Sequence, residues 1–139
     1  MAHPVHPAIV HFPIACWTLS TFGDIASLWL GEAVWKLSGI LLVIGTVMAV
    51  AAMVSGLLEL KKIDAADEAS RTADIHMQLI LVAWTLYAIS LFMRLKGLQL
   101  AAPGMAEMLL SGFGLAILFT AGWYGGKLVY QHGVGVQKQ

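Results

Sequence analysis

Charge is scarce in this chain, and its scarcity excludes a water-soluble surface. Asp, Glu, Lys and Arg make up 12% of the 139 residues, whereas soluble domains average roughly 25%. Hydrophobic residues make up 59%, and the mean hydropathy is +0.80. Eight basic and eight acidic side chains cancel, with no basic arm, so nucleic acid is excluded as a partner. The composition is that of an integral membrane protein whose main partner is the lipid bilayer.

Cysteine is nearly absent as well, because Cys16 stands alone. One cysteine excludes an intrachain disulfide and a cysteine-rich metal site. The sequence also lacks a nucleophile–base–orienter set and a phosphate-binding loop, so it suggests no reaction. No basic segment precedes the first apolar run, and we therefore expect the first helix to be retained rather than cleaved as a signal peptide.

Four apolar runs are each long enough to cross the roughly 30 Å of a bilayer as a helix. We predict spans at about residues 7–31, 37–58, 75–94 and 106–130, with Asp74 as N-cap of the third and Pro103-Gly104 as the turn before the fourth. Short connections make sequential helices antiparallel. The predicted fold is therefore all-α, an integral membrane antiparallel four-helix bundle. No internal repeat is evident, and we expect a single domain.

Two other features concern the helix interiors. Small residues four apart, Ala51 with Ser55 and Gly122 with Gly126, predict close helix packing and would also make room for a flat cofactor. Asp24 is the one carboxylate in the interior of a predicted span, since Glu107 lies at the very start of the fourth. We expect it to pair with Lys36 or Arg94, or to accept a hydrogen bond from a serine or tryptophan.

All five histidines come to the same membrane face in this topology. We call the face that holds the N-terminus face A and the opposite one face B. The histidines are His3, His6 and His11 at the start of the first helix, His76 in the first turns of the third, and His132 after the fourth. Intramembrane ionisable groups usually face the bundle interior and are functional candidates.

Imidazole is the commonest metal ligand, and cofactor sites in helical bundles are built from side chains on facing helices. A b-type haem needs only one or two axial imidazoles and a slot between helices. We therefore predict one or two haem b groups, and hence iron, bound by His6, His11, His76 and His132, with Arg71 paired to the propionates. Histidine-ligated copper, zinc or iron, and a cofactor-free structural subunit with interfacial histidines, are the open alternatives.

Two motifs carry a resemblance to a known family. They are His-Pro-x-x-Val-His-Phe-Pro-Ile-Ala at residues 6–15 and His-Gly-Val-Gly-Val at residues 132–136. Together they resemble a widespread bacterial family of predicted four-helix membrane proteins of unknown function, over essentially the whole chain. The family pattern carries over onto His6, His11, His76 and His132 but not His3. Because the family's domain is sometimes joined to c-type cytochrome domains, the resemblance implies electron transfer at the outer membrane face.

These inferences predict a small membrane cytochrome b-like electron-transfer protein, a carrier or subunit rather than a stand-alone enzyme. Its expected partners are a c-type cytochrome, a quinol or a respiratory complex, and a homo-oligomer is left open. We expect the bacterial inner membrane, with the histidines toward the outer face. The basic residues favour the cytoplasm for face A by five to three, against that orientation.

Overall fold

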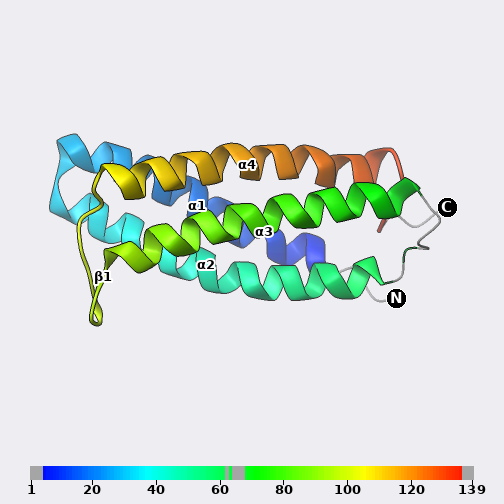
Figure 1. Ribbon diagram of the computed structural model, residues 1–139, viewed down its shortest axis with the longest axis horizontal. Helices are drawn as coiled ribbons and strands as arrows, with labels where there is room; N and C mark the ends of the chain where they lie inside the picture. The colour runs from blue at the N-terminus through cyan, green and yellow to red at the C-terminus, as the bar shows by residue number, and fades with distance from the viewer. Residues whose placement is uncertain (1–4, 62, 64–67, 136–139) are drawn as a thin grey trace.

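Four helices make up nearly all of the computed structural model, which describes residues 5–61, 63 and 68–135. The helices are α1 (Val5–Leu30), α2 (Glu32–Leu60), α3 (Glu68–Arg94) and α4 (Met105–Tyr130), and the strands β1 (Leu95–Lys96) and β2 (Gln99–Leu100) lie between α3 and α4. Successive helices run antiparallel, so that α1 begins and α4 ends at the same end of the bundle, face A (Figure 1). The predicted all-α antiparallel bundle is confirmed.

Helix α3 begins earlier than the sequence predicts. The helix starts at Glu68 rather than near residue 75, and Asp74 lies inside it, so the N-cap prediction for Asp74 is wrong. Hydropathy reports only the apolar part of a helix, whereas residues 68–74 are polar. Glu68 stands in the first turn, where the helix dipole favours a negative charge. The first two turns of α3 therefore extend past its apolar stretch at face A.

A β-hairpin that the sequence analysis did not predict connects α3 to α4. Leu95 pairs with Leu100 in an antiparallel register, and Gly97 supplies the positive φ of 65° that a two-residue turn requires. After the hairpin, the Gly104 backbone N–H donates to the Glu107 carboxylate at 2.9 Å, and α4 begins at the next residue. Helix α4 thus begins directly after the predicted turn at Pro103-Gly104.

Three of the described helices, α2, α3 and α4, are long and apolar enough to cross a membrane by length and composition. Helix α1 has 26 residues but carries Asp24 and two histidines. Its outward side chains are nonetheless apolar, as Phe12, Leu19 and Phe22 each expose more than half of their surface. It lies alongside α2 (Figure 1) and presents the same apolar exterior as its neighbours. This exterior matches a lipid-facing surface.

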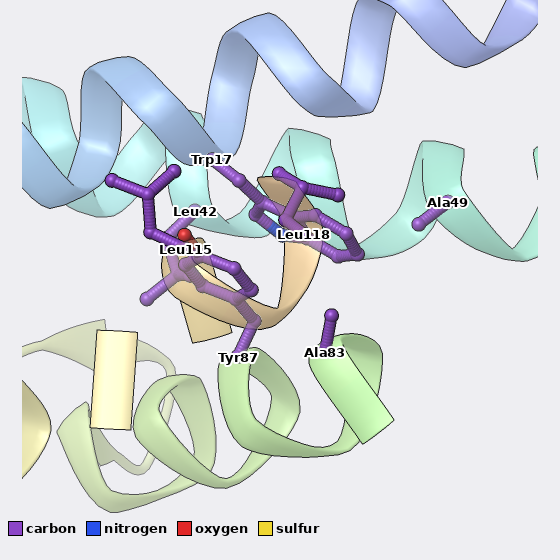
Figure 2. Close-up of a cluster of buried hydrophobic side chains, with 7 residues drawn as sticks. All are labelled: Trp17, Leu42, Ala49, Ala83, Tyr87, Leu115 and Leu118. Carbon is purple, nitrogen blue, oxygen red and sulfur yellow. The ribbon is translucent and has the colours of Figure 1, made fainter. Parts of the chain in front are cut away.

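The core is centred on two stacked aromatic rings. Trp17 of α1 and Tyr87 of α3 lie 4.6 Å apart between ring centroids with an interplanar angle of 6°, inside the cluster that Figure 2 shows. Each ring packs on a glycine of the neighbouring helix, Trp17 on Gly45 and Tyr87 on Gly114. A Cβ added at either glycine would lie 2.9 Å from the ring. Because Gly45 of α2 and Gly114 of α4 have no side chains, the two rings can meet at the bundle centre.

A buried ion pair joins α1 to α3 between the stacked rings and face B. Arg94 Nη1 lies 3.0 Å from both carboxylate oxygens of Asp24, and the two residues are 1% and 0% exposed. Ser38 also donates to Asp24. Arg94 donates further to the backbone carbonyls of Trp35 and Ala101, at 3.1 and 3.3 Å. The predicted pairing of Asp24 with Arg94 is confirmed.

Candidate cofactor site

A cavity of about 470 Å³ lies between the four helices near face A. Trp17, Ala49 and Leu118 are among its lining residues, and most of its wall is apolar. Cofactor sites are typically cavities of roughly 300–1,000 Å³ with apolar walls and a few placed polar groups. The polar groups here include imidazoles from two helices, His6 and His11 of α1 and His76 of α3.

His6 lies in the first turns of α1 and reaches across to α2. Its Nδ1 is 3.0 Å from the Ala52 carbonyl oxygen and 3.0 Å from Ser55 Oγ. Because a carbonyl oxygen only accepts hydrogen bonds, Nδ1 carries the proton in the bond to Ala52. The ring lies against Gly56, where an added Cβ would stand 2.8 Å from the imidazole Cε1. The glycine therefore makes the space that the imidazole occupies.

His76 of α3 is held by α4 in the same way. Its Nδ1 lies 2.8 Å from the Ala121 carbonyl oxygen. The ring packs against Gly125, where an added Cβ would stand 3.2 Å from Cε1. The same argument places the proton of His76 on Nδ1.

This anchoring is the arrangement that metal-bound histidines use. Such histidines almost always donate their second ring N–H to a carbonyl or carboxylate, which fixes the tautomer and orients the ring. In the described part of the chain, nothing forms a hydrogen bond with Nε2 of His6 or His76. Each ring therefore leaves Nε2 as the nitrogen that is open to a metal.

His11 lines the same cavity without an anchor on a second helix. Its Nδ1 makes a hydrogen bond with the carbonyl of Pro7, one turn earlier on α1, and the side chain is exposed. The ring is thus held against its own helix at the edge of the cavity. It is less constrained toward the opposite helices than His6 is.

The structure does not bring His132 or Arg71 to the cavity wall. His132 follows α4, and its Nε2 lies 3.2 Å from Thr72 Oγ1 of α3. Its neighbour Val134 does line the cavity. Arg71 is exposed on the first turn of α3. Both residues therefore lie at the face-A end of the bundle but outside the cavity wall, and His3 lies outside the described residues.

The carbonyls and glycines that position the imidazoles were missed by the sequence analysis. They are Ala52 and Gly56 on α2, and Ala121 and Gly125 on α4. The small-residue pairs predicted from spacing lay one position away from each of them. Spacing alone gives the presence of small residues on a helix, whereas the rotation of that helix decides which of them meets a ring.

The chain matches the model of a known protein family over nearly its whole length. Residues 2–138 match the family model described as "Predicted membrane protein (DUF2231)". No curated protein and no solved structure matches the chain.

Proposed function

This chain belongs to the DUF2231 family of predicted membrane proteins, and we propose that it is a small membrane cytochrome of the b type that carries electrons at face A. One observation carries the proposal. His6 and His76 come from two different helices and line one cavity, and each has its Nδ1 bonded to a backbone carbonyl of a neighbouring helix. Both imidazoles are therefore oriented by backbone carbonyls, with Nε2 as the remaining ring nitrogen, before any metal arrives.

The donor set fits haem better than a bare metal ion. Zinc in proteins takes about four ligands, at least three of them from the chain. Within residues 5–61, 63 and 68–135, no three His, Cys, Asp or Glu side chains lie close enough together to hold an ion. A haem needs only one or two axial imidazoles from the protein. Two anchored histidines in an apolar cavity meet that requirement.

Non-covalent haem b is the form that the sequence allows. Covalent attachment of a c-type haem needs a Cys-x-x-Cys-His motif, and this chain has a single cysteine. When bound, the haem would supply one-electron redox chemistry. The protein would supply the imidazoles and the apolar wall that excludes water, and these set the reduction potential. We propose Arg71 as the cation for the propionates, because it is exposed at the same face.

The exposed position of the site at one membrane face fits a carrier that hands electrons to another protein. We infer a bacterial inner-membrane location with face A outside, and a c-type cytochrome, a quinol or a respiratory complex as partner. The cavity reaches the surface of the bundle at Pro7 and His11, because both lining residues are exposed.

The proposal is tested by the composition of the purified protein. Protein from haem-replete cells, solubilised in detergent, should contain extractable haem b and a matching amount of iron. A colourless preparation with stoichiometric copper or zinc would show that the protein binds a metal ion in place of haem. A preparation with neither haem nor metal would contradict the proposal. A cofactor-free structural subunit would then be the remaining function.

A further inference from the structure

The hairpin α1–α2 and the hairpin α3–α4 repeat one arrangement of side chains. Helix α1 packs along α2, and α3 along α4, more extensively than either hairpin packs on the other. Matching positions on α1 and α3 are 70 residues apart and include His6 and His76, Trp17 and Tyr87, Ser20 and Ser90, and Asp24 and Arg94. Matching positions on α2 and α4 are 69 residues apart and include Gly45 and Gly114, Ala52 and Ala121, and Gly56 and Gly125.

The matched residues make matched contacts at the cavity. His6 bonds to the Ala52 carbonyl and His76 to that of Ala121. The carbonyl and the glycine beneath each ring are four residues apart in both halves. The central rings of Trp17 and Tyr87 likewise each rest on a matched glycine.

The agreement continues toward face B. Ser20 donates to the Ser38 carbonyl at 2.8 Å, and Ser90 donates to the Glu107 carbonyl at 3.1 Å. Ser38 and Glu107 are again 69 residues apart. Three separate contacts, at different depths of the bundle, therefore follow one relation between the halves. The chain is built as two equivalent helical hairpins.

A two-fold axis must pass where matched residues touch each other. Trp17 stacks on Tyr87, and Asp24 pairs with Arg94, so both contacts lie on this approximate axis. Because α1 and α3 run in the same direction, the axis runs along the helices, as in membrane proteins with parallel repeats. The cavity lies on it too, since its wall contains matched pairs from both hairpins, among them Val10 with Ile80, Ala49 with Leu118, and Leu60 with Val129.

We infer that His6 and His76 are the two axial ligands of a single haem bound on this axis. The inference rests on the proposed function and narrows it from one or two haems to one. A haem offers an axial position on each face, which suits two equivalent imidazoles from opposite hairpins. The two other histidines within the described residues have no equivalent, because His11 is matched by Leu81 and His132 by Ile63. They therefore provide no second pair of ligands.

The test is a haemin titration of apoprotein made in haem-limited cells. Wild-type protein should bind one haem per chain and give the low-spin spectrum of a six-coordinate iron. His6→Ala and His76→Ala should each give a high-spin, five-coordinate spectrum that added imidazole returns to low spin. His6→Gln and His76→Gln keep a donor for the carbonyl and guard against misfolding. His132→Ala changes a histidine outside the cavity wall; it is the matched control and should keep the wild-type spectrum. His11→Ala tests the remaining imidazole of the wall and should keep a six-coordinate iron.

Three outcomes separate the inference from the proposed function. One haem per chain, with the spin state sensitive to His6 and His76 alone, supports both. The inference is overturned by a second haem equivalent, or by a spectrum that shifts in the His11 or His132 variant but not in the His6 variant. The proposed haem-binding function would stand in either case. Wild-type protein that binds no haem overturns the proposed function, and the inference falls with it.

Discussion

Replacing Arg94 by leucine is expected to lower the free energy of unfolding by about 3–5 kcal/mol, the cost of removing one partner of a buried ion pair. Asp24 would remain buried inside the bundle, with the residue 0% exposed and only the Ser38 hydroxyl as side-chain donor. The lost free energy also includes the hydrogen bonds that Arg94 donates to the carbonyls of Trp35 and Ala101. Denaturation in detergent micelles, followed by circular dichroism, measures the change.

A double-mutant cycle with Asp24→Leu shows whether the pair itself is responsible. The double variant Asp24→Leu/Arg94→Leu should lose less stability than the two single variants together, because neither charge is then left buried alone. The exposed pair Lys36–Glu32, with a 2.6 Å contact, is the matched control. Lys36→Leu should cost less than about 1 kcal/mol. Strictly additive losses at Asp24 and Arg94 would show that the pair is not a unit.

Replacing Gly56 by alanine is expected to weaken haem binding by roughly 10–100-fold, the usual effect of disturbing the groups that orient a metal ligand. The new Cβ would stand 2.8 Å from His6 Cε1, so the ring must shift and its bond to Ala52 must lengthen. Gly125→Ala should act in the same direction but less strongly, because the corresponding distance to His76 is 3.2 Å. Haemin titration of the apoproteins ranks the two variants.

Gly112→Ala is the control for both glycine variants. Gly112 also lies inside α4, and nothing stands within 4 Å of a Cβ built there. Its affinity for haem should equal that of the wild type. Equal affinity in all three variants would mean that neither imidazole needs its present position.

Much of the fold could be predicted from the sequence, because hydropathy and loop length determine the helices and their directions. The apolar runs gave the number and direction of the helices, and topology then brought the histidines to face A. The buried carboxylate Asp24 required a partner, and Arg94 was one of two candidates at the right depth. The start of α3 was not predicted, because its first two turns, Glu68–Asp74, are not apolar enough to be recognised by hydropathy.

The repeat is hard to recognise from the sequence because only some matched positions are identical, such as His6 with His76 and Gly56 with Gly125. Others keep a role while changing the side chain, as in the tryptophan and tyrosine of the central stack. The ion pair is the extreme case, since Asp24 and Arg94 are matched positions of opposite charge. Opposite charges on the axis attract, whereas two identical charges there would repel. The contacts are therefore what make the equivalence of the two halves clear.

An iron anomalous difference map of crystals grown from protein purified out of haem-replete cells locates the bound haem directly. One iron peak per chain is expected inside the face-A cavity, between the imidazoles of His6 and His76. A peak beside His11 or His132, or a cavity that holds only lipid, would overturn the assignment of His6 and His76 as the haem ligands.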